Sequence, residues 1–230
     1  MPRIDTILEQ IRELAYQQAN DNSRREPLPI EPWSFCQRCV WTLDEHAGAH
    51  GLQPIRQFPT KAYLRELTEI WQRERLLRVE KSRQLMISWL MAALHLHAAL
   101  VNRGERIAWQ SKNFADADSM LRDRLWHIFL HIPNTFQKPK ARYLSGLIEV
   151  YHDTEAQLPT SQIMAIAQGA DQLRQYTFSR ILSDEFSFQE SQRESYAAMR
   201  PTIDGGGRLT IVSSANAENF FWELGHRDLC

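Results

Sequence analysis

Two kinds of hydrophobic pattern alternate along the chain. Short runs rich in apolar residues predict strands over 35–43, 76–80, 106–111, 162–167, 177–183 and 208–213. Longer stretches with apolar residues three and four positions apart predict helices over 3–19, 61–72, 88–102, 113–131, 191–199 and 218–229. A β-hairpin is predicted over 143–151. Strands that alternate with helices predict an α/β fold with a mainly parallel central sheet flanked by helices.

The polar segments between these runs divide the chain. Residues 20–32 are rich in proline and predict a linker between an N-terminal helix and the main domain, which gives a division into 1–32 and 33–230. Residues 44–59 and 169–175 are predicted as loops. Ligands of parallel sheets bind at the carboxyl ends of strands, so the loops at 81–87, 111–113, 184–187 and 213–216 are the candidate site.

The composition is that of an ordinary soluble globular protein, with 43% apolar and 24% charged residues among 230. No apolar run is long enough to predict a membrane span, and the N-terminus has no signal-peptide pattern. The net charge of −1 means that any contact with nucleic acid must use a local patch. Cys36 and Cys39 could bind zinc with His46 and His50, but two reduced side chains in or near a strand are the favoured interpretation.

The segment LLRVEKSRQLMISWL (76–90) resembles a phosphate-binding loop only in part. In the pattern G-x-x-x-x-G-K-[ST] between a strand and a helix, Ser88 alone stands in register, while Lys81 and Met86 replace the glycines and Ile87 replaces the lysine. A strand that leads into a helix N-terminus nevertheless offers free N–H groups and a positive dipole end to phosphate. Lys81 and Arg83 add two cations beside it.

Two further strands end in side chains that suit this chemistry. ILSDEF (181–186) places Asp184 and Glu185 directly after an apolar run, where one carboxylate can hold Mg²⁺ and the other can polarise a water molecule. TIVSSAN (210–216) ends in hydroxyl and amide groups that could sense a terminal phosphate. Acidic residues and serines are also common at solvent-exposed strand ends, so each motif alone is weak.

Together, KSRQLMISW, ILSDEF and IVSSAN resemble the ATPase domain of large terminase subunits, the DNA-packaging motors of tailed bacteriophages, over roughly residues 35–220. The resemblance implies a P-loop NTPase of the additional-strand catalytic-glutamate class that uses ATP and Mg²⁺. Some members carry the essential lysine at the start of the loop, which implies Lys81 for this role. The nucleotide-binding loop would then comprise Lys81, Ser82, Arg83, Gln84, Leu85, Met86, Ile87 and Ser88.

The resemblance also implies roles for residues outside the loop. Ser88 and Asp184 would hold Mg²⁺, and Glu185 would be the catalytic base. Arg174 would reach the phosphates of a neighbouring subunit, and the base contacts would come from Gln57 and Phe58. The residues that couple hydrolysis to movement would be Ser213, Ser214 and Asn216.

The family implies partners as well: double-stranded DNA, a portal protein, a small terminase subunit and further copies of the chain in a ring, in the host cytoplasm and away from membranes. No acidic cluster follows the coupling segment, so no nuclease domain is expected in this chain. Two alternatives remain. One is another P-loop translocase or helicase-like ATPase, and the other is a docking module that binds no nucleotide.

Overall fold

A seven-stranded sheet forms the centre of the computed structural model, which describes residues 25–44, 47–153, 155–216 and 218–226. In spatial order its strands are β4 (Leu76–Glu80), β11 (Arg208–Ser213), β10 (Arg180–Asp184), β5 (Arg106–Ser111), β9 (Ser161–Ala167), β8 (Leu147–Tyr151) and β7 (Lys140–Leu144). The first five are parallel, and the β7–β8 hairpin adds an antiparallel edge. The mainly parallel α/β fold and the hairpin are confirmed.

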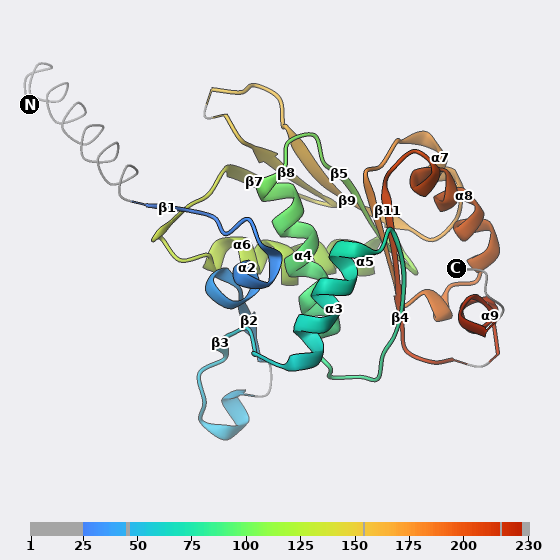
Figure 1. Cartoon of the computed structure of the whole chain (residues 1–230), viewed down its shortest axis with the longest axis horizontal. Helices are drawn as coiled ribbons and strands as arrows, with labels where there is room; N and C mark the ends of the chain where they lie inside the picture. Colours follow the sequence, from blue (N-terminus) through green and yellow to red (C-terminus); the bar gives the residue numbers. More distant parts are fainter. Residues whose placement is uncertain (1–24, 45–46, 154, 217, 227–230) are drawn as a thin grey trace, which may run out of the picture.

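Helices cover both faces of the sheet (Figure 1). One face packs against α2 (Pro32–Cys39), α3 (Ala62–Arg73), α4 (Ile87–Val101) and the continuous helical stretch α5 (Phe114–Met120), η2 (Leu121–Trp126) and α6 (His127–His131). The other face packs against α7 (Asp171–Gln175), α8 (Gln192–Asp204) and α9 (Phe220–His226). Alternate residues of each strand enter the two cores, so Trp109 faces the first and Ala108 the second.

The position of β11 defines the class of the fold. β11 lies between β4, which leads into the loop at 81–86, and β10, which carries the acidic pair. This inserted strand is the additional strand that the predicted P-loop class requires. It brings the ends of three strands that are distant in sequence to one edge of the sheet.

The buried helix α4 follows the loop and anchors it. Its residues from Trp89 to Leu100 are all buried, including His95, as expected for a helix that is apolar on every side. Burial lowers the pKa of His95 to about 4, and its Nδ1 lies 2.8 Å from the Met91 carbonyl oxygen. His95 is therefore a neutral core residue.

The strand predicted over 35–43 is wrong. Residues 32–39 form helix α2, and only Trp41–Leu43 form a strand, β2. The Glu31 carboxylate accepts hydrogen bonds from the N–H groups of Trp33 and Ser34, which caps the helix at its N-terminus. Proline at the first turn and buried residues at helical spacing complete the element: Pro32, Phe35, Cys36 and Cys39.

Three segments predicted without regular structure also differ. The loop over 44–59 contains η1 (Ala47–His50) and β3 (Ile55–Gln57), which pairs antiparallel with β2. The loop over 169–175 contains helix α7. Within the predicted linker, β1 (Glu26–Pro27) pairs with β6 (Phe136–Gln137), and Leu28 is buried in the core, so this part packs on the domain. The helix predicted over 3–19 lies outside the described residues.

The two thiols of α2 are buried. Burial raises the pKa of the Cys36 thiol well above its usual range and that of Cys39 to about 12, so both stay neutral and are poor metal ligands. His46 lies outside the described residues. Among the residues that the structure describes, no helix is both long enough and apolar enough to cross a bilayer.

Candidate nucleotide site

The carboxyl ends of β4, β10 and β11 bring the predicted motifs together. In the sheet register, Ser213 lies beside Glu80 and Asp184 lies beside Val212. The Lys81 backbone N–H donates to the Ser213 carbonyl at 2.9 Å and so extends the ladder by one bond. Residues 81, 185 and 214, each the first after its strand, therefore meet at one edge.

The side chains of Lys81, Glu185 and Ser214 are joined at this edge. Lys81 Nζ donates to Glu185 Oε1 at 2.8 Å, and Ser214 Oγ donates to Glu185 Oε2 at 3.1 Å. Burial raises the pKa of the Glu185 carboxyl, but the hydrogen bond and charge of Lys81 and the hydrogen bonds from Ser214 together lower it by more, so the pKa lies below its usual value. Glu185 is therefore an ionised carboxylate at neutral pH.

The neighbouring carboxylate, Asp184, has a different environment. It is buried, and this burial raises its pKa to about 6 although the charge of Lys81 opposes the shift. Its Oδ1 accepts a hydrogen bond from the Glu185 backbone N–H at 3.0 Å. Asp184 thus carries a negative charge that the chain compensates only in part, which suits a ligand for a cation.

The loop after β4 adopts the backbone of a tight turn without glycine. Gln84 and Met86 have left-handed conformations, with φ of 65° and 58°. Left-handed backbone costs an ordinary residue about 1–2 kcal/mol, and such strain is typical of functional loops. The Met86 side chain packs against the main core, and the Tyr63 hydroxyl donates to the Leu85 carbonyl at 3.1 Å.

Helix α4 begins directly at this loop. Its N-cap is Met86, and no side chain caps the helix there, so the N–H groups of its first turn remain available as donors for an anion. The Ile87 side chain is buried and can contribute only its backbone. Ser88, the second residue of α4, stands at the sequence position that the Ser/Thr of a phosphate loop takes.

Two cavities flank the loop. The first, of about 620 Å³, is lined by the loop and by the β2–β3 hairpin; its residues are Thr42, Leu43, Asp44, Arg56, Gln57, Pro59, Lys81, Ser82, Gln84, Leu85, Met86, Ile87, Ser88, Trp89 and Arg124. The second, of about 550 Å³, is lined by Arg83, Ser88, Ser111, Lys112, Asp116, Ser119, Met120, Arg124, Asp184, Glu185, Phe188 and Ser214. Ser88 and Arg124 line both.

Not every predicted base contact reaches these cavities. Gln57 lines the first cavity from β3, but Phe58 is a core residue whose ring packs edge-on against Trp33. The reason is the alternation of side chains past the end of β3, which turns successive residues to opposite sides. The β2–β3 hairpin was not predicted from the sequence, and neither was the cavity wall that it forms, which includes the Arg56–Asp44 ion pair at 3.2 Å.

The residues predicted to couple hydrolysis to movement lie behind the acidic pair. Ser213 Oγ accepts from the Ser187 backbone N–H at 3.0 Å, and Asn216 Nδ2 donates to the Ser187 carbonyl at 3.2 Å. Ser214 contacts Glu185 directly. The segment that follows β11 is thus tied by hydrogen bonds to the turn that follows β10.

Arg174 is not part of this constellation. It lies in the last turn of α7, is exposed, and lines neither of the two cavities. Arg124, by contrast, was not predicted as part of the nucleotide site, and it lines both cavities. No sequence signal around 121–126 distinguishes Arg124 from a surface arginine, because it lies in an amphipathic helix near Arg122.

The residues at this edge fit a bound Mg·nucleotide. Ser88 and Asp184 line the same cavity and present the hard oxygen ligands that Mg²⁺ prefers. The described residues contain no group of three His, Cys, Asp or Glu side chains placed to hold a metal. A cation here would therefore take its other ligands from phosphate and water, as Mg²⁺ commonly does.

Comparisons with known proteins agree with this fold. Neither protein-family models nor curated protein sequences match the chain. Among solved structures, a variant of the large terminase ATPase domain of Thermus phage P74-26 has a TM-score of 0.55 and 16% identity, covering 80% of this chain and 74% of that one.

Two other large terminases are similar as well. That of the HK97 bacteriophage has a TM-score of 0.59 and 12% identity, covering 86% of this chain and 41% of that chain. That of a thermophilic bacteriophage has a TM-score of 0.53 and 9% identity, covering 67% of this chain and 39% of that chain. The chain thus has the fold of large terminase ATPase domains and spans about two fifths of these two terminases.

Proposed function

From the fold that this chain shares with large terminase ATPase domains, we propose that it binds Mg·ATP and hydrolyses it to drive double-stranded DNA into a viral procapsid. The observation that carries the proposal is the contact between Lys81 Nζ and Glu185 Oε1, 2.8 Å apart although 104 residues separate them in sequence. This contact joins the lysine of the shifted phosphate loop to the second residue of the acidic pair, as a phosphate-binding site at this edge requires.

The chemistry divides among the residues of this edge. Lys81, Arg83 and the N–H groups of the first turn of α4 bind the phosphates, and Ser88 and Asp184 hold Mg²⁺, which would neutralise the charge that develops on the phosphates. When a nucleotide phosphate pairs with Lys81 in place of Glu185, the Glu185 carboxylate is free to orient and deprotonate the attacking water. The cavity beside the β2–β3 hairpin receives the nucleoside, with Gln57 at its wall.

The remaining parts of the proposal concern the assembly. Arg174, exposed on α7, would act on the site of a neighbouring subunit in a ring, where an arginine supplied in trans stabilises the transferring phosphate. The ring would work with a portal protein and a small terminase subunit in the host cytoplasm. Ser213, Ser214 and Asn216 would transmit the state of Glu185 to the turn at 186–188. The ATPase domain would comprise residues 33–230, with the segment 26–28 packed on it.

Nucleotide binding and turnover by the full chain test this function. We expect Mg·ATP binding by the unmodified protein and by Glu185→Ala, no turnover by Glu185→Ala, and loss of binding by Lys81→Ala. If the unmodified protein fails to bind millimolar Mg·ATP, the proposal is wrong and the alternative of a docking module is favoured. Duplex unwinding in place of packaging would favour the helicase-like alternative.

A further inference from the structure

Arg124 stands where the two cavities of the site meet. It belongs to η2, a π-helical segment inserted between α5 and α6. Only Ser88 shares with it a place in the lining of both cavities. The first cavity contains the phosphate loop, and the second contains Asp184 and Glu185. A group that extends from one cavity into the other would therefore lie beside Ser88 and Arg124.

The phosphate chain of a nucleotide is such a group. Under the proposed function, its nucleoside end lies in the first cavity and its terminal phosphate faces the water beside Glu185 in the second. We propose that the Arg124 guanidinium contacts the terminal phosphate of ATP bound to its own subunit, as a catalytic residue distinct from Lys81 and from any arginine supplied by a neighbour. This inference rests on the proposed function and adds to it a residue that recognises the phosphate to be cleaved.

The side chain is held in position from both sides. Its guanidinium carbon lies 4.9 Å from the centre of the Trp89 ring, and its Nε donates to Met120 Sδ at 3.3 Å. Trp89 follows Ser88 at the start of α4, so Arg124 is packed on the same helical turn that presents the phosphate-binding N–H groups. An arginine packed in this way loses little conformational entropy when it forms paired hydrogen bonds to phosphate.

The π-helical geometry of η2 is consistent with a functional role. A π-turn inserts one residue into a helix and costs stability, and such turns often occur at functional sites. Here it lies in the segment that places Arg124 toward the cavities while Leu121 and Leu125 remain buried in the core. The neighbouring Arg122 is exposed and forms paired hydrogen bonds with Asp123, at 2.7 and 2.9 Å, outside both cavities. The two arginines thus make a matched pair.

The test compares ATP with ADP in the full chain. Arg124→Met keeps an aliphatic side chain against Trp89 but removes the charge. Arg124→Lys keeps a positive charge but lacks the planar guanidinium that can form paired hydrogen bonds. Because the terminal phosphate is present only in ATP, we expect Arg124→Met to weaken Mg·ATP binding about tenfold relative to Mg·ADP binding, the loss of one charged hydrogen-bonding group. Arg124→Lys should restore part of the affinity but not the turnover, and Arg122→Met should change neither.

The ratio of the two affinities is measured within each variant, so partial unfolding cannot imitate the effect. If Arg124→Met weakens ATP and ADP binding equally, or weakens neither, Arg124 does not contact the terminal phosphate and the inference is wrong. If the unmodified chain binds neither nucleotide, the proposed function itself has failed and the inference falls with it. If the unmodified protein binds nucleotide and Arg124→Met has the same ratio of ATP affinity to ADP affinity, this inference alone is overturned.

Discussion

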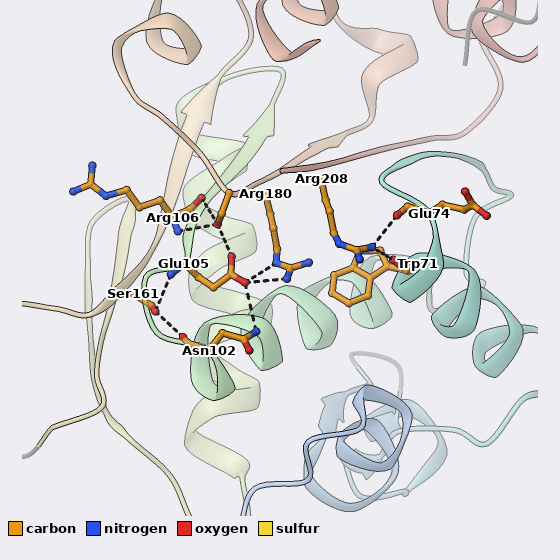
Figure 2. Close-up of polar contacts among 9 residues, drawn as sticks. Trp71, Glu74, Asn102, Glu105, Arg106, Ser161, Arg180 and Arg208 are labelled. Atoms are coloured by element: carbon orange, nitrogen blue, oxygen red, sulfur yellow. Dashed lines mark hydrogen bonds and ion pairs between the residues drawn. The ribbon is translucent and has the colours of Figure 1, made fainter. Parts of the chain in front are cut away.

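Charged side chains have different partners at the two ends of the central sheet. At the amino ends of β5, β10 and β11, ionic side chains are paired with one another and with backbone groups (Figure 2). At the carboxyl ends of β4, β10 and β11, a lysine and a glutamate pair with each other, and the backbone beside them is strained. The first arrangement supports the fold, whereas the second leaves groups that a ligand can rearrange.

At the amino ends, Glu105 is the centre of the network (Figure 2). Its Oε1 accepts two hydrogen bonds from Arg180, at 3.0 and 2.9 Å, and its Oε2 accepts from Ser179. Arg208 Nη1 donates to the carbonyls of Trp71 and Glu74, both at 2.9 Å, and so satisfies groups at the end of α3. The chain itself provides the partners for these charges.

At the carboxyl ends, the chain provides fewer partners. The Lys81 side chain is only 9% exposed, but that of Glu185 is 40% exposed. Three residues without glycine's freedom have left-handed backbone here: Gln84, Met86 and Glu185. Backbone strain and a half-exposed ion pair at one edge, beside the buried and paired Glu105 and Arg180 at the other, indicate that the carboxyl edge is built for a ligand rather than for stability.

The largest effect on stability should come from Arg180→Met. This change leaves Glu105 buried without its cation, and breaking a buried pair in this way costs about 3–5 kcal/mol of unfolding free energy. Chemical denaturation measures it. The matched control is Arg103→Met, which removes an ion pair of similar length to the exposed Asp153 and should change little. Equal losses in both variants would contradict the contrast between the two ends.

The next effect is a gain in stability from Asp184→Asn at neutral pH. The pKa of Asp184 is raised from 3.8 to about 6 in the folded protein. Between these values the folded state binds more protons than the unfolded state, so the contribution of this group to stability falls as pH rises from about 4 to about 6. Removing the carboxylate should therefore raise the free energy of unfolding by about 2–3 kcal/mol at pH 7.

The same variant should match the unmodified protein at pH 4, where Asp184 is protonated in the fold. Denaturation of both proteins at pH 4, 5, 6 and 7, without Mg²⁺ or nucleotide, measures the difference. Titrating groups that do not interact with Asp184 contribute equally to both proteins, so their effects cancel. A gain that is independent of pH would mean that the Asp184 charge is not the cause of the cost.

A smaller gain should follow from Gln84→Gly. Gln84 is exposed, so little packing is lost, and glycine adopts its φ of 65° without strain. The substitution relieves about 1–2 kcal/mol of left-handed strain. This gain exceeds the entropic cost of ordering a glycine backbone on folding, which is about 0.5–1 kcal/mol. The expected net gain is under about 1 kcal/mol in unfolding free energy. Gln84→Ala is the control, and a comparable gain in that variant would show that strain is not the reason.

The sequence predicted the fold class because parallel strands are buried on both faces and give continuous apolar runs, such as IMAIA at 163–167. The sequence also predicted that Lys81, Asp184 and Glu185 lie at one edge, because the carboxyl ends of parallel strands lie at the same edge of a sheet. It could not predict α2, where an N-cap and a proline outweighed the strand-like run at 35–43. Local preference was overridden by a cap that lies outside the run.

Arg124 and the β2–β3 hairpin show the other limit of sequence reasoning. Arg124 reaches the site through a π-turn and through contacts with Trp89 and Met120, which depend on tertiary packing. The hairpin joins two segments of only three residues each, too short to give a periodic signal. Phe58 was predicted to contact the base for lack of this information, and it lies in the core instead.

The affinity of Glu185→Gln for Mg·ATP tests the central claim most directly. The account holds that Lys81 is paired with Glu185 in the absence of nucleotide and that phosphate displaces Glu185 from this pair. Removing the Glu185 charge should therefore free the lysine before nucleotide binds. Glu185→Gln should then bind Mg·ATP several-fold more tightly than the unmodified protein and fail to hydrolyse it, while Ser214→Ala, which keeps the ion pair, should bind as before. Weaker binding by Glu185→Gln, or turnover at the unmodified rate, would contradict the account.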